Sequence, residues 1–225
     1  MSTSALMETK ATLDRSSPAH SGWRARVFAF LLLRVNAKYE HLMAARKRAL
    51  LVDLRGTVLE IGPGAGVNLR HYDPGVHWIG IEPNPYMRAY LEKEAERCGL
   101  QVDLRAGNAE QLDVADRSMD AVVCTLVLCS VRDVGRVLRE IHRVLKPGAH
   151  FVFIEHVAAP RGTWLRRLQD LFRPLLVRFA VGCHPNRETW TIIEGAGFSK
   201  MALHHFRAPA LFPILSPHIA GVAIR

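Results

Sequence analysis

The stretch "VLEIGPGAG", from Val58 to Gly66, decides the fold of this chain of 225 residues. An apolar run is followed directly by glycines in alternate positions, at Gly62, Gly64 and Gly66. A short apolar run that ends at glycine is typical of a buried strand in a parallel sheet. Glycines after such a strand let the backbone pass close to a small molecule, because no Cβ atom intervenes. The pattern predicts a ligand-binding loop at the carboxyl end of a buried strand.

The segments around this stretch alternate between strand-like and helix-like patterns. Strands that alternate with helices form a parallel sheet that is covered on both faces. The last two strands, in "SKMALHHFRA" and "SPHIAGVAIR", are expected to form a terminal hairpin after a helix that ends at Gly197. We predict an α/β fold with a seven-stranded, mostly parallel sheet, helices on both faces and an antiparallel last strand. The other expected strands cover residues 57–62, 77–82, 101–107, 119–128 and 149–157, and the other expected helices residues 85–99 and 132–148.

The residues after the glycines limit the ligand. A Walker loop ends in Gly-Lys-Ser/Thr, but Gly66 is followed by Val67 and Asn68, which excludes that loop. A dinucleotide fingerprint places its third glycine where this chain has Val67, so that loop is disfavoured. The remaining pattern, Glu-x-Gly-x-Gly-x-Gly, is that of an S-adenosylmethionine loop.

Two acidic residues fit this ligand. Glu60, in the strand, can hold the ammonium group of the ligand directly or through water. Glu82 ends the second strand, sixteen residues after Gly66, where a carboxylate can accept both ribose hydroxyls. Such a carboxylate argues against NADP and is compatible with NAD or S-adenosylmethionine.

From Tyr39 to the C-terminus the chain resembles the Rossmann-like class I S-adenosylmethionine-dependent methyltransferases. The broad match rests on "VLEIGPGAG", "GIEPNP", "GNAEQLDVADRSMDAVVC" and "RVLKPGAHFVFIEHV". More narrowly, the chain is similar to the methyltransferase-like 7 (thiol S-methyltransferase) family. That match rests on "CTLVLCSV", "FIEHVAAP", "RETW", "FSK" and "SPHIAGVAI".

The resemblance implies a set of cofactor contacts. The segment 108–110 would lie beside the adenine, and the end of the fourth strand would line the methionine arm. Tyr39 would close over the same end of the cofactor, although a core aromatic on an amphipathic helix fits the pattern equally well. Asn68 is a cofactor residue or, equally, a cap for the next helix. The full set is Tyr39, Glu60, Gly62, Gly64, Gly66, Asn68, Glu82, Pro83, Asn108, Ala109, Glu110, Thr125 and Leu126.

Catalysis by this family requires mainly positioning and desolvation, because the sulfonium of the cofactor is already an activated methyl donor. His156, just past the fifth strand, is the best-placed candidate for a general base toward a thiol, with a structural histidine as the alternative. Glu155 would point to the other side of the strand and orient or oppose it. His184 is a second candidate for the base.

The four cysteines show no close pairs, which favours a reducing, intracellular setting. Cys129 is interpreted as a pocket-lining residue, because direct methyl transfer needs no covalent intermediate. No metal site is expected from Cys124, Cys129, Cys183 and nearby histidines. Strand alternation would point Cys124 and Cys129 to opposite faces, and the spacing does not suit zinc.

Residues 161–187 interrupt the alternation of strands and helices. Between Trp164 and Phe179, apolar residues recur at three- and four-residue steps, with arginines largely elsewhere on the helical wheel and Pro174 expected to kink or restart the helix. We interpret this segment as a substrate lid whose apolar stripe suggests a lipophilic acceptor. Core packing against the edge of the sheet is the alternative.

The net charge of +9 belongs to two flanking segments, residues 1–55 and 161–187. Such segments suit anionic lipid, nucleic acid or an acidic partner, or simply solubility. No aromatic-rich basic patch is visible, so a nucleic-acid partner is not expected. The apolar run "VFAFLLL" is flanked by arginines and is far shorter than the roughly 18 residues of a membrane span. We therefore expect a cytoplasmic protein with peripheral membrane contact.

These observations predict three parts and one activity. Residues 1–22 form a flexible N-terminus, residues 23–51 a helical segment that closes the cofactor site, and residues 52–225 the methyltransferase domain. The predicted function is methyl transfer from S-adenosylmethionine, with S-adenosylhomocysteine as product, to a thiol of a small lipophilic acceptor or natural product. The alternative is N-, O- or C-methylation of a lipid, quinone or other small metabolite.

Overall fold

The computed structural model describes residues 39–180, 182–208 and 212–225. The predicted flexible segment 1–22 and the part of segment 23–51 that precedes residue 39 lie outside these residues. Residues 39–51 are helical. The elements that follow are β1 (Thr57–Ile61), η1 (Leu69–His71), β2 (His77–Ile81), η2 (Pro85–Met87), α2 (Arg88–Cys98), β3 (Val102–Arg105), β4 (Met119–Thr125), α3 (Val134–Val144), β5 (Leu145–His156), α4 (Trp164–Phe179), α5 (Thr189–Glu194), β6 (Lys200–Arg207), η3 (Pro213–Leu215) and β7 (Pro217–Ile224).

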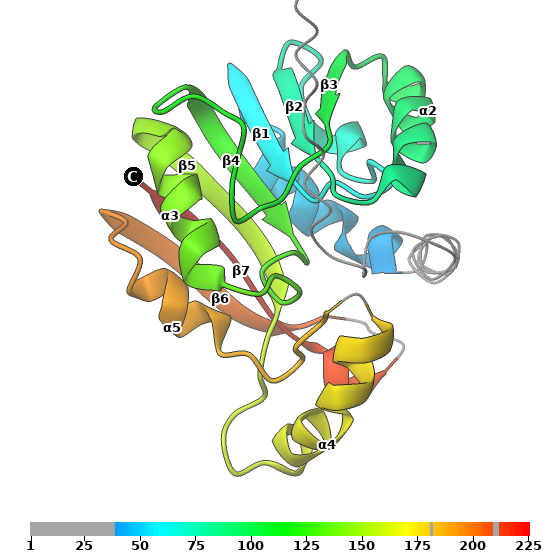
Figure 1. Ribbon diagram of the computed structural model, residues 1–225, viewed down its shortest axis with the longest axis vertical. Coiled ribbons are helices and arrows are strands. Elements are labelled where there is room, and N and C mark those ends of the chain that lie inside the picture. Colours follow the sequence, from blue (N-terminus) through cyan, green and yellow to red (C-terminus); the bar gives the residue numbers. More distant parts are fainter. Residues whose placement is uncertain (1–38, 181, 209–211) are drawn as a thin grey trace, which may run out of the picture.

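Seven strands form one sheet in the order β3-β2-β1-β4-β5-β7-β6 (Figure 1). The pairs from β3 to β5 are parallel, and β7 is antiparallel to both β5 and β6. The predicted seven-stranded sheet and terminal hairpin are therefore confirmed. Since the chain order reverses between β1 and β4, the carboxyl ends of these two strands flank the crevice where ligands of open α/β sheets bind.

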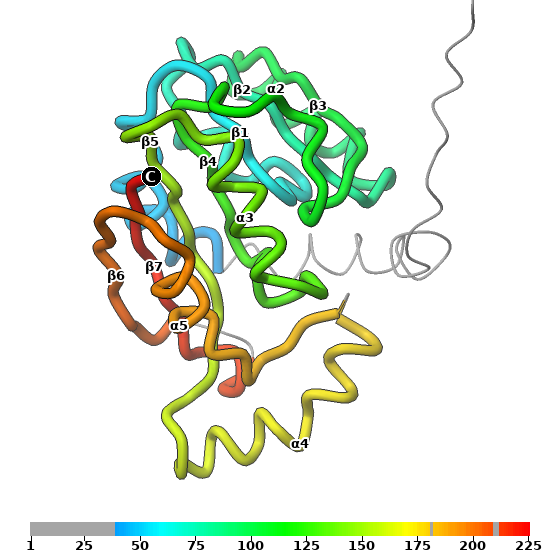
Figure 2. The backbone as a smooth tube through the Cα atoms, turned by 60° about the vertical axis from the view of Figure 1, so that its left-hand side comes forward, coloured from blue at the N-terminus to red at the C-terminus, as the bar shows by residue number. Residues whose placement is uncertain are grey.

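Alternating residues of the central strands point to opposite faces of the sheet and form part of two hydrophobic cores. On one face, Leu59 and Val122 pack with α3 and α5, and on the other Val58 and Val123 pack with α2, η1 and the helix at 39–51. These helices make the sheet a two-sided layer, as continuous apolar strands require. The helix α4 leaves this body and extends beyond the carboxyl edge of the parallel strands (Figures 1 and 2).

Several boundaries differ from the sequence-based expectation. The strand β4 ends at Thr125 instead of residue 128, because Leu126 takes a left-handed φ of 58° that no strand accommodates. The strand β5 begins at Leu145 instead of residue 149. Its first residue pairs with Met119 at the start of β4, and the register then shifts between Met119 and Ala121. The expected helix at 85–99 is a 3-10 turn followed by α2, and α5 ends at Glu194 before Gly197. The helix α4 runs through Pro174 without restarting.

Candidate active site

The glycine loop leaves β1 with three left-handed residues. The φ angles of Gly62, Gly64 and Gly66 are +63°, +56° and +78°. A Cβ atom on Gly62 would lie 2.8 Å from the side chain of Val127, and one on Gly66 would lie 2.9 Å from that of Leu69. A Cβ atom on Gly64 would meet nothing within 4 Å. Gly62 and Gly66 therefore allow close packing within the protein, whereas Gly64 faces open space at the predicted cofactor site.

Glu60 lies beneath this loop and is 1% exposed. Its Oε1 accepts a hydrogen bond from Asn68 Nδ2 at 2.8 Å, and its Oε2 accepts from Tyr72 Oη at 2.8 Å and Trp78 Nε1 at 3.2 Å. Burial raises the pKa of this carboxyl, and the three donors oppose the rise. Both oxygens are thus engaged within the protein. Direct contact with the ammonium of a ligand, which the sequence suggested as one option, has no exposed carboxylate oxygen to support it.

Asn68 connects the glycine loop to the end of β4. Its Nδ2 donates to Glu60 and also to Thr125 Oγ1 at 3.1 Å. Asn68 does occupy the N-cap position of η1, which was its alternative role, but its side chain makes no capping hydrogen bond there. Its Oδ1 is buried and has no hydrogen-bond partner within the described residues. This orphan acceptor at the crevice is suited to an ammonium donor.

Glu82 ties the end of β2 to the glycine loop. Its Oε2 accepts from the amide of Gly64 at 2.9 Å and its Oε1 from the amide of Asn84 at 2.8 Å. Burial raises the pKa of Glu82, and the two amide donors lower it. Each carboxylate oxygen retains a further lone pair for a hydroxyl donor. Pro83, which follows, is exposed.

The predicted adenine segment is shaped by its own side chains. Asn108 Oδ1 accepts from the amide of Glu110 at 3.1 Å, so this oxygen closes the local turn. Glu110 Oε1 accepts from the amide of Arg132 at 3.0 Å, just before α3. Ala109 is buried. The segment is therefore fixed against the start of α3, with Asn108 exposed at its edge.

A turn after β4 brings the chain back across the crevice. Leu126 follows the end of β4 and has a left-handed φ, but its amide still donates to the carbonyl of Ile154 in β5 at 2.8 Å. Glu155, in β5, then accepts from the amides of Val127 at 2.8 Å, Leu128 at 2.9 Å and Cys129 at 3.2 Å. Burial raises the pKa of Glu155 well above its usual value, and these amides oppose the rise. The role of Glu155 is to hold the turn, which sequence alternation did not reveal.

Three candidate residues converge at this turn. Cys129, His156 and Cys183 are buried, and one ligand atom of each lies within 4.8 Å of the others. Cys183 Sγ is 3.1 Å from His156 Nε2. The hydrogen bond from Cys183 lowers the pKa of the Cys129 thiol well below its usual value, and the charge of His156 acts in the same direction. Burial opposes a charge on His156, but the adjacent Cys129 raises its pKa overall. Cys124 lies apart, in the core under α3.

Tyr39 lies at the same edge of the sheet. Its hydroxyl is 3.2 Å from Nε2 of His218, whose ring packs edge-on to His156 with centroids 6.2 Å apart. Burial raises the pKa of Tyr39. Tyr39 therefore links the helix at 39–51 to His218 in β7, which packs on His156 and was not identified from the sequence.

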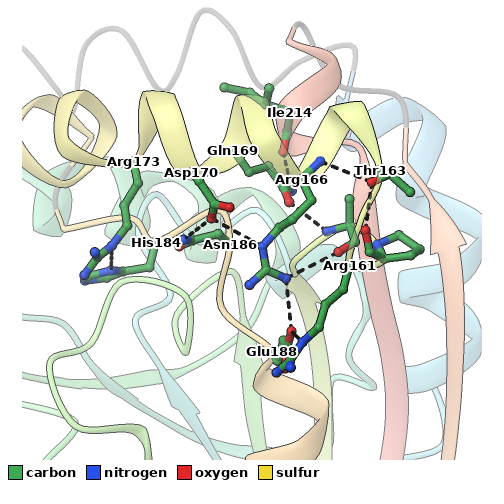
Figure 3. Close-up of polar contacts among 12 residues, drawn as sticks. Arg161, Thr163, Arg166, Gln169, Asp170, Arg173, His184, Asn186, Glu188 and Ile214 are labelled. Carbon is green, nitrogen blue, oxygen red and sulfur yellow. Dashed lines mark hydrogen bonds and ion pairs between the residues drawn. The ribbon is translucent and has the colours of Figure 1, made fainter.

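The helix α4 is fastened to the body through its first half. Gln169, fully buried, accepts from the amide of Ala159 at 2.7 Å and donates to the carbonyl of Ile214 at 2.9 Å. Arg166 bonds Glu188 at 3.0 Å (Figure 3). The second candidate base, His184, accepts from Arg173 Nε at 3.2 Å through its Nδ1. Burial and the neighbouring arginines lower the pKa of His184, so it serves α4 and not the cysteine pair.

Comparison with known proteins identifies the family to which the chain belongs. Residues 59–153 match the model of the family described as "Methyltransferase domain". The human thiol S-methyltransferase TMT1A is 40% identical over 209 residues, which cover 88% of this chain and 86% of the relative. Human thiol S-methyltransferase TMT1B is 37% identical over the same shares. The chain belongs to the thiol S-methyltransferase family of S-adenosylmethionine-dependent methyltransferases.

Solved structures support the fold. A SAM-dependent methyltransferase of Thermotoga maritima matches with a TM-score of 0.64 and 21% identity, covering 89% of this chain and 98% of that one. One of Methanosarcina mazei matches with a TM-score of 0.61 and 20% identity, covering 77% of this chain and 94% of that one.

More distant curated relatives include the phosphatidylethanolamine N-methyltransferase of Cereibacter sphaeroides, 31% identical over 67% of this chain and 72% of that protein.

The enzyme uses S-adenosylmethionine as methyl donor, and the residues of the crevice fit this cofactor. The open space at Gly64 and the orphan Oδ1 of Asn68 are the observations that decide the fit. Asn68 Oδ1 and Thr125 would receive the amino-acid end, and Glu82 the ribose. The sequence placed Glu60 there, but the structure supports it as the anchor of Asn68. When bound, the cofactor supplies a methyl group on a positively charged sulfur.

A surface groove elsewhere has no part in this site. Its volume is about 550 Å³, and it lies at the amino ends of β4 and β5, lined among others by Asp120 and Lys146. Lys146 Nζ bonds Asp120 at 2.6 Å, and Asp120 also accepts from the amide of Thr57 at 2.8 Å. These contacts join strand ends, so we assign the groove no role in the reaction.

Proposed function

We propose that the enzyme transfers the methyl group of S-adenosylmethionine to the thiol of a small, lipophilic acceptor. The observation that carries this proposal is the 40% identity to human thiol S-methyltransferase TMT1A over 88% of the chain. A thiol reacts as its thiolate, and a free thiol has a pKa near 8.5, so a substantial thiolate fraction exists near neutral pH. The task of the protein is then to align the sulfur with the methyl group and to exclude water.

We propose that the turn after β4 and the helix α4 bound the acceptor side of the site. Five large apolar side chains of α4 are exposed, with Trp164 at 66%, Leu171 at 68% and Phe179 at 64%, together with Phe172 and Leu175. The alternative role of this stripe in core packing is therefore not supported. An exposed apolar helix at the proposed acceptor side would suit a lipophilic acceptor. We propose residues 161–187 as the substrate lid and the helix ending at residue 51 as a wall of the cofactor site.

The predicted role of His156 as a general base remains a prediction. Its position at the end of β5 suits that role. However, Nε2 contacts Cys183 at 3.1 Å, and Nδ1 is buried without a hydrogen-bond partner among the described residues. Neither nitrogen faces an open acceptor site directly. We therefore expect His156 to influence the reaction through its interactions with Cys129 and Cys183, and not by direct contact with the acceptor.

We also propose peripheral contact with a membrane surface, on the cytoplasmic side. Among the residues that the structure describes, no helix is both long and apolar enough to cross a bilayer. The exposed apolar side chains of α4 alternate with exposed Arg167, Arg173 and Arg178. This combination is typical of helices that lie in the interface of anionic membranes. A lipophilic acceptor dissolved in the membrane would reach the site along the same helix.

A second candidate function is N-, O- or C-methylation of a lipid or quinone. The more distant relatives favour it, because they include the phosphatidylethanolamine N-methyltransferase and a demethylmenaquinone methyltransferase of Thermus thermophilus, 30% identical over 48% of this chain and 50% of that protein. Turnover of thiophenol, phenol and aniline with S-adenosylmethionine separates the two functions. We expect methylation of thiophenol alone, and turnover of only phenol or aniline would contradict the thiol assignment. The assay requires a phosphine reductant, since thiol reductants are themselves acceptors.

A further inference from the structure

Three metal-ligating atoms from separate parts of the chain meet at the carboxyl edge of the sheet. They are Sγ of Cys129 after β4, a ring nitrogen of His156 at the end of β5 and Sγ of Cys183 after α4, all within 4.8 Å of one another. Around a tetrahedral zinc ion, with bonds of about 2.3 Å to sulfur and about 2.1 Å to nitrogen, ligand atoms lie roughly 3.6 to 3.8 Å apart. The 3.1 Å between Cys183 and His156 is slightly shorter. Shifts of about 1 Å would close the cluster on a zinc ion.

The surrounding contacts hold these ligands in place. Glu155 binds the turn that carries Cys129, and Arg187 donates to the carbonyls of Leu128 and, at 2.9 Å, of Val131. The segment that carries Cys183 packs tightly on this turn. At Gly182, with φ of +81°, an added Cβ would lie 2.9 Å from the carbonyl oxygen of Ser130. The amide of residue 184 also donates to the carbonyl of residue 129 at 2.8 Å. The three ligands are thus buried, and the two that lie in loops are held by backbone contacts between those loops.

The neighbouring ligand-type side chains have other partners. His218 faces Tyr39 with Nε2 at 3.2 Å and the carbonyl of Ser216 with Nδ1 at 3.0 Å. Both oxygens of Glu155 accept backbone amides. Within the described chain the cluster therefore offers three ligands, which leaves the fourth position of a tetrahedral ion open. Two thiolates and one imidazole select zinc among the common metals, and an open fourth position is the mark of a catalytic site.

We propose that Cys129, His156 and Cys183 bind one zinc ion whose fourth position receives the sulfur of the acceptor thiol. The second half of this proposal rests on the proposed thiol S-methyltransferase function. It revises the expectation of no metal, which relied on strand alternation between Cys124 and Cys129. That alternation stops at Thr125, where β4 ends.

The chemistry balances without an oxidant or reductant. Coordination to zinc deprotonates a thiol outright, and its proton passes to solvent. The zinc-bound sulfur then supplies the electron pair for the new bond to the methyl carbon. The bond between that carbon and the donor sulfonium breaks, and its electron pair stays on the donor sulfur, which becomes a neutral thioether. The methylated acceptor is also a thioether, a weaker ligand than a thiolate, and leaves the metal.

The metal content of the untagged protein tests the first half. We expect about one zinc per chain by mass spectrometry of the wild type and of Cys98→Ser, which removes a cysteine outside the cluster. Cys129→Ser and Cys183→Ser should lose zinc at least tenfold while keeping a native circular dichroism spectrum. To keep the test independent of the folding of these variants, the wild type is also depleted of metal and reloaded with cobalt, which should give a thiolate-to-cobalt absorption band. Wild type that takes up neither metal, or that contains a Cys129–Cys183 disulfide, would overturn the site.

The cobalt-loaded wild type tests the second half. Addition of thiophenol should strengthen and shift the thiolate-to-cobalt band, whereas phenol should leave it unchanged. An unchanged band with thiophenol would overturn the role of the metal in acceptor binding. The two proposals fail separately: zinc without any thiol turnover contradicts the proposed function, and thiol turnover without zinc contradicts the metal site.

Discussion

The carboxylate of Glu155 and the backbone amide of Cys129 are joined by a hydrogen bond of 3.2 Å. The same carboxylate accepts two further amides, so one buried side chain of β5 holds the whole turn after β4. This turn carries the proposed acceptor side of the site, and Val127 within it packs against the glycine loop. The acceptor and cofactor halves of the crevice are therefore mechanically linked through Glu155.

Replacing Glu155 with glutamine tests this link. The amide NH₂ of glutamine would face backbone donors, so we expect the free energy of unfolding to fall by about 3 kcal/mol. Urea denaturation measures this change. Glu96→Gln, an exposed change on α2, is the control and should stay within about 0.5 kcal/mol. A Glu155→Gln variant as stable as the control would show that the turn after β4 does not depend on the Glu155 carboxylate.

Gly64 offers a test of the cofactor loop with a matched control. Both Gly64 (φ +56°) and Gly99 (φ +64°) are left-handed, and a Cβ on either would meet no atom within 4 Å. Alanine at each position should therefore cost the same backbone strain, about 1 kcal/mol. Only at Gly64 would the methyl group enter the cofactor site. We expect calorimetry with S-adenosylhomocysteine to show at least tenfold weaker binding for Gly64→Ala and unchanged binding for Gly99→Ala. Equal affinities would place the cofactor elsewhere.

The sequence was sufficient for the sheet and the glycine loop because both depend on local patterns. Apolar strands and glycines at a strand end are read directly from neighbouring residues, and Glu82 follows from its distance along the chain. The turn after β4 was not predictable in this way. A left-handed Leu126 has no sequence signal, and without it the strand alternation at Cys129 was wrongly extended.

Contacts between residues that are distant in the sequence were not predicted, for a related reason. Glu60 and Asn68 were assigned to the ligand individually, whereas their mutual hydrogen bond depends on the turn into η1. Cys183 lies 54 positions from Cys129, and the two are brought together where the segment at Gly182 packs on Ser130. Spacing rules for metal sites detect ligands close in sequence, and this cluster draws its ligands from three distant parts of the chain.

His71 in η1 makes stability depend on pH. Its side chain is buried, Nε2 has no partner in the described chain, and burial together with Lys47, Arg70 and Arg48 lowers its pKa to about 4. The unfolded chain takes up a proton near pH 6.5 while the folded chain does not, so stability is lost as pH falls from about 6.5 toward 4.

Between pH 7.5 and pH 5, this difference amounts to about 2 kcal/mol. Urea denaturation at both pH values should show that wild type loses about that much more stability than His71→Leu. Parallel losses in the two proteins would mean that His71 takes up its proton in the folded state as well.

The exposed stripe of α4 predicts membrane binding. The double variant Leu171→Asp, Phe179→Asp places charges on side chains that are 68% and 64% exposed, so the melting temperature should not change. Cosedimentation with vesicles of phosphatidylcholine and phosphatidylserine should fall at least fivefold. Ile192→Asp alters an exposed apolar residue of α5 instead and should bind as wild type does. Equal binding of all three proteins would remove α4 from the membrane contact.

The central claim is that this crevice methylates sulfur. One acceptor that carries both competing groups, 4-mercaptophenol, tests it most directly, because the thiol and the phenol enter the same site at the same concentration. We predict that mass spectrometry of the product, formed with S-adenosylmethionine under a phosphine reductant, shows the S-methyl compound in at least a hundredfold excess over the O-methyl compound. A product methylated mainly on oxygen would contradict the account.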